Sequence, residues 1–243
     1  MIICTALIFW AASLLRGILG FTTALVAVPP LLHLGYTMSE CVALLLSVSL
    51  VQSLMGVRQL RAEIPWPEVR QATVWRLLGL PFGTLTLSIL DTSDPSHIRS
   101  LVGLMILLAL AAHRFGGSRM RLKSEWFRQV SFSSGLLLAA FGTGGPPIVL
   151  WTVSQEWASR KSRAFYFALS LYCVPVSLLM LLYSFGSEIV PCLLGGFLYS
   201  PVIFGGAWMG LKLGDLLPCR LLRRITLGVL AATGFGSICF SLI

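Results

Sequence analysis

The sequence predicts an all-α polytopic integral membrane protein, in which two inverted repeats each contain a broken, re-entrant pair of half-helices followed by three transmembrane helices. Three observations predict this fold: an apolar composition, two apolar stretches interrupted by glycine and proline, and basic residues gathered in a few loops. Of the 243 residues, 56% are hydrophobic and only 11% are charged, against roughly 25% charged in soluble domains. The net charge of +9 suits a nucleic-acid-binding protein, but such proteins are rarely this apolar. The composition therefore excludes a soluble enzyme and a disordered chain.

Uncharged stretches between the charged residues mark the expected membrane spans. A helix needs about 20 apolar residues to cross roughly 30 Å of hydrocarbon, and six stretches supply all or most of that length. They are residues 41–57, 77–90, 100–113, 164–187, 189–211 and 225–243. Interfacial residues would complete the shorter stretches.

Two further apolar stretches, 2–34 and 129–155, are interrupted in the middle. The first contains Gly20-Phe21-Thr22-Thr23 and then Pro29-Pro30, and the second contains Phe141-Gly142-Thr143-Gly144-Gly145-Pro146-Pro147. Glycine weakens a helix and proline removes a backbone donor. In a membrane, such a break persists only where protein buries it or where it lines a wet cavity. Each stretch is therefore predicted to form a pair of half-helices.

Basic residues indicate the orientation, because cytoplasmic loops are rich in Lys and Arg. Four segments hold all but three of the 18 basic residues: 58–70, 114–128, 156–163 and 212–224. Three other segments contain acidic residues and a single base: 35–40, 91–99 and 184–188. The first group is predicted to be cytoplasmic and the second external. Because only 129–155 lies between two cytoplasmic loops, it must enter and leave on the same side.

The same reasoning applied to 2–34 places both chain termini outside and makes the two halves inverted copies. The expected organisation is a first membrane repeat at 1–114, a basic cytoplasmic linker at 115–128 and a second membrane repeat at 129–243. A shift of 122 residues places Gly20 on Gly142 and Gly83 on Gly205. Inverted repeats with helices broken near the midplane are typical of secondary transporters, and the breaks usually mark the binding site.

No pattern of residues predicts catalysis, a cofactor or a metal site. The three histidines lie far apart without acidic neighbours, and there is no phosphate-binding loop. The six cysteines occur singly, without a C-x-x-C pair, and are interpreted as packing residues. The sequence therefore predicts that the protein is not an enzyme.

The distribution of charge favours an anion as the ligand. None of the nine acidic residues falls inside an apolar span, whereas a cation transporter usually needs one there. Arg16 lies four residues before the first break. It either faces a site, where it and helix N-termini would attract an anion, or reaches the headgroups as a snorkelling residue. For Arg76 the sequence favours snorkelling.

The two breaks supply the other candidate binding residues. Glycines there allow the backbone to approach a ligand, and threonine hydroxyls near opposed helix N-termini could cradle an oxyanion. The alternative is that the glycines only permit close helix packing. Ser47, Gln52, Gln155, Ser170 and Tyr172 are interpreted as packing residues. The candidate site comprises Arg16, Gly20, Thr22, Thr23, Gly142, Thr143, Gly144, Gly145 and Pro146.

The stretch from Gly135 to Leu150 resembles the second signature of the TauE/SafE family of sulfite and organosulfonate exporters, in which a G-x-G-G-P element follows a helix of small residues. The family's first signature, Gly-Phe-Gly-Gly-Gly followed by Val-Pro-x-Leu, is matched in part by Gly20-Phe21-Thr22-Thr23-Ala24 and Val28-Pro29-Pro30-Leu31. Thr, Thr and Ala replace the three glycines. The resemblance covers nearly the whole chain and implies export of a small sulfur-containing oxyanion across the inner membrane without ATP.

The sequence as a whole predicts an inner-membrane secondary transporter that exports a small anion, sulfite or an organosulfonate, by alternating access around the two breaks. Two alternatives stay open: a passive anion channel and an accessory membrane protein without a substrate. The expected partners are the anion and the lipid bilayer, with no nucleic acid, and a homodimer is left open.

Overall fold

Apolar helices make up almost all of the structure that can be described. The computed structural model describes residues 2–21, 23–91, 126–155, 157–216 and 228, and within these ranges it contains helices and no strand. The helices are α1 (Ile2–Leu19), α2 (Thr23–His33), α3 (Met38–Gln59), η1 (Arg61–Glu63), α4 (Trp66–Asp91), α6 (Trp126–Phe141), α7 (Gly145–Ser154), α8 (Ser159–Phe185), η2 (Gly186–Ile189), α9 (Val190–Leu198) and α10 (Ser200–Leu216). The all-α class is therefore confirmed for the described residues.

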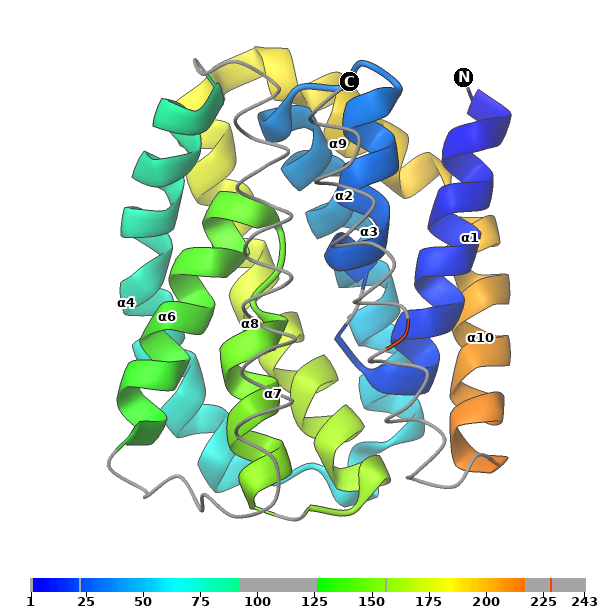
Figure 1. Cartoon of the computed structure of the whole chain (residues 1–243), viewed down its shortest axis with the longest axis vertical. Helices are drawn as coiled ribbons and strands as arrows, with labels where there is room; N and C mark the ends of the chain where they lie inside the picture. Colours follow the sequence, from blue (N-terminus) through cyan, green and yellow to red (C-terminus); the bar gives the residue numbers. More distant parts are fainter. Residues whose placement is uncertain (1, 22, 92–125, 156, 217–227, 229–243) are drawn as a thin grey trace.

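The first broken stretch forms the hairpin of α1 and α2. Gly20 ends α1 with φ +94°, a left-handed conformation that favours glycine, and its N–H still donates to the carbonyl of Arg16 at 2.6 Å. Figure 1 shows α2 returning toward the end of the bundle from which α1 starts. Pro29 and Pro30 lie inside α2, so the break is at Gly20 and not at the prolines.

The second broken stretch forms the hairpin of α6 and α7, which enters from the opposite end of the bundle (Figure 1). Gly142 ends α6 with φ +66°, and the two prolines that follow occupy the first turn of α7, where a missing N–H costs no helical hydrogen bond. The rings of Phe127, near the start of α6, and Trp151, near the end of α7, lie 4.2 Å apart. Both predicted helix breaks are therefore present, one in each half of the chain.

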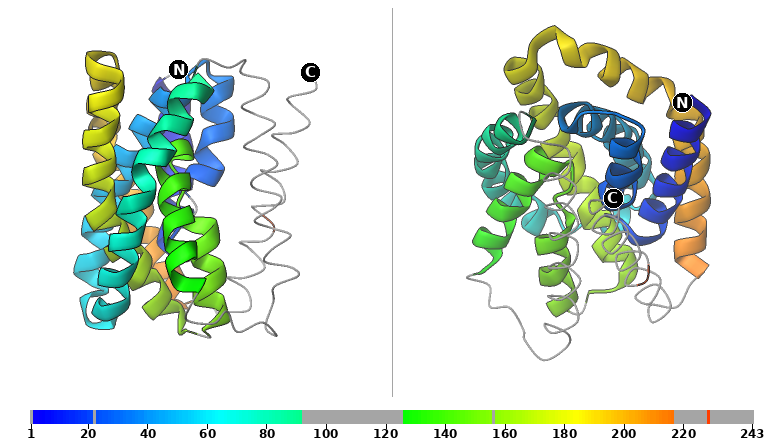
Figure 2. Two further views of the ribbon diagram at one scale, coloured as in Figure 1. Left: turned by 90° about the vertical axis from the view of Figure 1, so that its left-hand side faces the viewer. Right: turned by 45° about the horizontal axis from the view of Figure 1, so that its top comes forward.

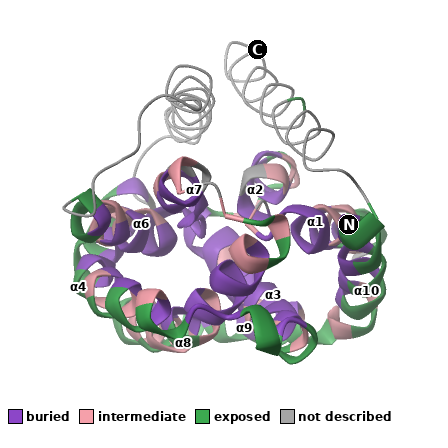
Figure 3. Ribbon diagram, turned by 90° about the horizontal axis from the view of Figure 1, so that it is seen from below, coloured by how far each residue is buried: buried purple, intermediate pink, exposed green. Residues whose placement is uncertain are grey.

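Among the three long apolar spans of the described chain, α3 is the most enclosed. It begins with a capping box, in which the hydroxyl of Thr37 accepts from the N–H of Glu40 and the Glu40 carboxylate accepts from the N–H of Thr37. From Met38 to Gly56 most of its side chains are buried, and Figure 3 shows the other helices arranged around it. α4 and α8 turn exposed apolar side chains outward, as helices that face lipid do.

The predicted span 189–211 is wrong as a single helix. It begins at the last residue of η2 and contains the short helix α9 and most of α10, with a bend at Tyr199. Figure 2 shows α9 crossing the end of the bundle between α8 and α10. The cause is Pro201, which has no N–H for the carbonyl of Phe197, and the hydroxyl of Ser200 donates to that carbonyl instead.

Two pairs of parallel helices meet at surfaces made of glycine, which we call the glycine seams. In the α4–α6 seam, Gly79, Gly83 and Gly135 face the backbone of the other helix. In the α1–α10 seam, Gly17, Gly206 and Gly210 do the same. A methyl group at any of these six positions would come within 3 Å of a facing backbone atom, closer than side-chain atoms pack. The seams therefore bring backbones together as small residues do in membrane helices.

Three spans in the described part of the chain are long and apolar enough to cross a membrane, namely Met38–Gln59, Trp66–Leu90 and Ser159–Leu198. The shorter helix Ile3–Leu19 is apolar as well. These spans fit the polytopic membrane protein that the composition predicts. The predicted helices at 100–113 and 225–243, apart from Gly228, and most of the linker at 115–128 lie outside the described residues.

Candidate functional site

The two helix breaks meet at one small cavity inside the bundle. Its volume is about 30 Å³, which compares with about 10–15 Å³ for a site that holds one water molecule by the same kind of measure. The breaks touch each other there, because a methyl group on Gly145 would lie 2.9 Å from Cδ2 of Phe21. Seven of the nine predicted site residues line the cavity: Arg16, Gly20, Thr23, Gly142, Thr143, Gly144 and Gly145.

Two predicted site residues do not contribute to the described wall of the cavity. Thr22 lies outside the described residues. Pro146 is in the first turn of α7 but does not line the cavity. Because Pro146 and Pro147 carry no N–H, the first turn of α7 has only the N–H groups of Gly145 and Ile148 to offer a ligand.

Arg16 points into the protein and lines the cavity. It lies in the last turn of α1, only 4% of it is exposed, and its Nη2 donates to Oγ of Ser53 at 3.1 Å. Its guanidinium also lies over the ring of Phe167, with Cζ 5.6 Å from the ring centroid, and its Nε has no hydrogen-bond partner. Of the two interpretations open for Arg16, this burial favours a site residue over a snorkelling one.

Arg76 lines the same cavity, and its interpretation as a snorkelling residue is wrong. It is 4% exposed, its Nε also has no hydrogen-bond partner, and its guanidinium lies against Gly144, where a methyl group would overlap Nη2. Arg76 is ten residues beyond Trp66, the first residue of α4. At about 1.5 Å per residue this is about 15 Å along the helix, half the thickness of the hydrocarbon and too deep for easy snorkelling.

Threonine side chains line the cavity from both breaks. The hydroxyl of Thr23, at the start of α2, donates to Oε1 of Gln52 at 3.3 Å, and Nε2 of that glutamine has no partner. The hydroxyl of Thr143 is buried and also has no partner. Gln52, which the sequence assigned to packing, therefore positions Thr23. The group around the cavity is rich in unsatisfied donors, and buried donors need acceptors.

No described acidic side chain lines the cavity. Those that the structure describes lie at helix ends: Glu40, Glu63, Glu68, Glu188 and Asp215. Neither Arg16 nor Arg76 forms an ion pair with a described residue. Two buried positive charges therefore face one cavity without a described carboxylate to balance them, an arrangement that suits a negatively charged ligand.

The rest of the cavity wall includes two aromatic and two serine side chains that were not predicted as site residues: Phe21, Tyr166, Ser49 and Ser170. Tyr166 packs edge-on against Phe21, with ring centroids 5.7 Å apart, and its hydroxyl shares a hydrogen bond with that of Thr152. For Phe21 a signal was present in the sequence, because it directly follows the glycine of the first break. The others lie on uninterrupted apolar spans, where the sequence carries no signal of direction.

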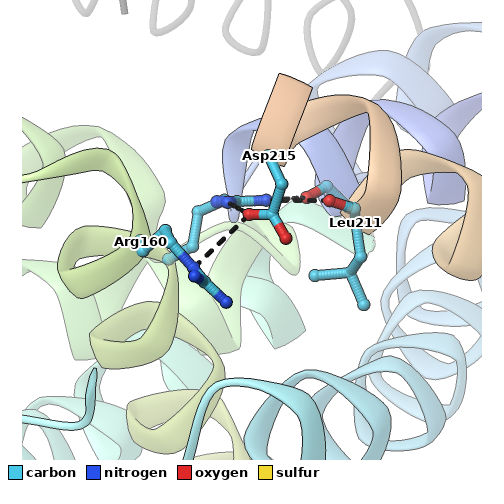
Figure 4. A network of polar contacts seen from close by, with 5 residues as sticks. Arg160, Leu211 and Asp215 are labelled. Carbon is cyan, nitrogen blue, oxygen red and sulfur yellow. Dashed lines mark hydrogen bonds and ion pairs between the residues drawn. The ribbon is translucent and has the colours of Figure 1, made fainter. Parts of the chain in front are cut away.

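Arg163 plays a structural part that its place in a basic segment conceals. The sequence counts it among the cytoplasmic loop residues, but α8 begins at Ser159, and Arg163 is only 1% exposed. Its Nη1 donates to the carbonyls of Gly17 at 3.4 Å and Leu211 at 3.3 Å, and its Nη2 pairs with Asp215. Figure 4 shows this network, in which Arg160 and Asp215 approach each other from α8 and α10. Arg163 therefore ties α8 to the ends of α1 and α10.

Comparison with known proteins identifies one family. Residues 4–236, nearly the whole chain, match the family model described as "Sulfite exporter TauE/SafE". No curated protein and no solved structure matches the chain significantly.

Proposed function

We propose a transport function for this chain, because it belongs to the sulfite exporter TauE/SafE family of membrane transporters. The proposed protein is an inner-membrane secondary transporter that exports a small anion, sulfite or an organosulfonate. It works by alternating access around its two helix breaks. The observation that carries this proposal is the cavity where the breaks meet, which two buried arginines line. Glycine, threonine and arginine at broken helices are the kind of groups from which transporters build anion sites.

An inverted repeat would explain how the two glycine seams resemble each other. In the α1–α10 seam, Gly206 faces Trp10 and Gly210 faces Leu14. In the α4–α6 seam, Gly79 faces Phe132 and Gly83 faces Leu136 in the same way. A shift of 122 positions carries the α1 residues onto the α6 residues, and it also carries Gly20 onto Gly142. This common spacing supports a repeat at 1–114 and another at 129–243. The packing relates Gly83 to Gly210, not to Gly205, which faces open space.

The seams also suggest which helices would move together. Backbones in contact along a seam cannot slide without collision, so α1 and α2 would move with α10, while α6 and α7 would move with α4. The cavity lies between these two groups, and α3 and α8 supply the rest of its wall. Alternating access would then be a relative movement of the two groups that opens the cavity first to one side and then to the other.

The basic residues of the loops support the orientation in the membrane, and the membrane potential supports the direction of transport. We place the segments 58–70, 114–128, 156–163 and 212–224 in the cytoplasm, and both termini outside, on the strength of their basic residues. A cell that is negative inside favours export of an anion by about 2.3 kcal/mol for each charge per 100 mV, so export needs no ATP. A reporter fused within 115–125 should be found in the cytoplasm, and an external reporter would overturn this topology.

Flux into proteoliposomes tests the function directly. The purified protein is reconstituted and offered sulfite, sulfoacetate, sulfate and acetate, with Arg16→Gln and Gly144→Leu as site variants. Arg58→Gln and Gly205→Leu are the matched controls, because Arg58 is exposed at the end of α3 and Gly205 has no neighbour within 4 Å.

We expect saturable flux and counter-exchange in the wild type and in both controls, and a strong loss in both site variants. Flux that does not saturate and shows no counter-exchange would identify a passive anion channel. The absence of flux for all four anions would refute the proposed function. Equal flux in all five proteins would refute the site.

A further inference from the structure

Two guanidinium groups line one cavity. The presence of two positive charges, not one, bears on the charge of the ligand. Arg16 comes from α1 and Arg76 from α4, so the two groups of helices described above each bring one arginine to the cavity. Both arginines are buried and line the same small cavity. From this arrangement we infer that the cavity selects a small doubly charged oxyanion, one negative charge for each arginine, over singly charged anions and over anions with an organic tail. This inference rests on the proposed function and narrows its substrate class.

The charge balance around the cavity supports a ligand with two negative charges. Arg163, the third buried arginine of the described chain, is paired with Asp215 and with two backbone carbonyls. Arg16 and Arg76 have no such carboxylate among the described residues. A singly charged anion would leave one buried positive charge without compensation, whereas a doubly charged anion balances both. The difference is large inside a protein, where charges are weakly screened.

The size of the cavity supports an ion without a tail. A volume of about 30 Å³ accommodates a compact ion of a few heavy atoms, judged by the room that one water molecule needs. Phe21 and Tyr166 close one part of the wall, and Ile148 and Val174 contribute apolar surface elsewhere. An organic tail would have to displace these side chains or the breaks themselves. Sulfite and other inorganic dianions fit this description, and sulfonates with a carbon chain do not.

The test compares anions matched in shape but not in charge. Sulfate and perchlorate are both tetrahedral, with four oxygens, and carry two charges and one charge respectively. Methanesulfonate carries one charge on a similar head, and sulfoacetate carries two charges but has a tail. Binding of each to the purified full-length protein is measured by titration calorimetry at constant ionic strength, with sulfite alongside.

In the wild type we expect sulfate and sulfite to bind at least about tenfold more tightly than perchlorate, methanesulfonate and sulfoacetate, because only a compact dianion both fits the cavity and balances the two positive charges. Arg16→Gln and Arg76→Gln should each remove most of the preference for sulfate over perchlorate, and Arg58→Gln should keep it. The wild-type comparison stands even if a variant does not fold.

Perchlorate or methanesulfonate binding as tightly as sulfate in the wild type would overturn the inference about charge. Sulfoacetate binding more tightly than sulfate would overturn the inference about size. These failures differ from a failure of the proposed function, in which no anion binds or crosses the membrane. Transport of all anions with equal affinity would keep the transporter and refute only the selectivity.

Discussion

Replacing Gly144 with alanine should disable the site by displacing one arginine. The new methyl group would overlap Nη2 of Arg76, and it would lie 2.8 Å from Cζ of that arginine and 2.6 Å from the carbonyl oxygen of Ser134. The carbonyl oxygen of Gly144 itself accepts from the hydroxyl of Ser134, so the backbone on that side is held in place. The guanidinium of Arg76 must therefore move, and the backbone at Ser134 or Gly144 must shift as well.

The size of the effect follows from the contacts that would be lost. Overpacking a tight site costs typically about 1–3 kcal/mol of folding stability. A hydrogen bond to a charged group contributes about 1.5–3 kcal/mol. Since about 1.4 kcal/mol corresponds to a tenfold change in affinity, we expect Gly144→Ala to weaken anion binding by about 10- to 100-fold. Its melting temperature should fall by a few degrees.

The assay is titration calorimetry with sulfate, combined with thermal unfolding in the same detergent. Gly205→Ala is the control, because nothing lies within 4 Å of its new methyl group, and it should change neither quantity for the worse. In the double variant Gly144→Ala, Arg76→Lys, the slimmer lysine should relieve the crowding at residue 76 and restore part of the melting temperature without restoring full affinity, because the contact with the Ser134 carbonyl remains. The reasoning would be refuted if Gly144→Ala bound sulfate as the wild type does. A loss of stability with unchanged binding would show that Arg76 does not touch the anion.

Three further variants test the packing of the fold by thermal or denaturant unfolding. Asp215→Asn leaves Arg163 buried without its carboxylate and should cost about 2 kcal/mol, less than a fully buried pair because the Asp215 side chain is 42% exposed; unchanged stability would show that the carbonyl contacts alone satisfy the arginine. Gly210→Ala should cost about 1–3 kcal/mol by forcing α1 and α10 apart, while Gly205→Ala on the same helix should cost nothing, and equal effects would argue against the glycine seam. Thr37→Ala removes the capping box of α3 and should cost about 1 kcal/mol, with no loss expected only if α3 begins elsewhere.

The helix breaks were predictable from the sequence because they depend on local chemistry. Glycine disfavours the interior of a helix wherever it occurs, and Gly20 and Gly142 adopt the left-handed conformation that this residue permits. The bend at Tyr199 has a local cause as well, in Pro201. It was missed because an uncharged stretch of suitable length predicts one span when charge is the only marker used.

The lining of the cavity was less predictable, because it depends on which way a side chain points inside the bundle. Arg16 and Arg76 both lie in apolar surroundings, and only the packing of neighbouring helices decides whether an arginine reaches the headgroups or turns inward. Arg163 is a second case in which the sequence does not show whether an arginine is buried. It sits in a segment whose charge predicts a cytoplasmic loop, yet α1 and α10 enclose it. The charge pattern predicts orientation without showing which bases are buried.

The glycine seams have a consequence for how the chain is made. Gly17 packs against Gly210, so α1 meets this neighbour only after the helices between α1 and α10 have been synthesised. Until then its small-residue face has no partner in the bilayer, and the membrane insertion machinery or a chaperone would have to shield it. The N-terminal half, produced alone, should therefore be prone to degradation. The C-terminal half supplied as a separate chain should rescue it, since the two halves stabilise each other across the seams more than within themselves.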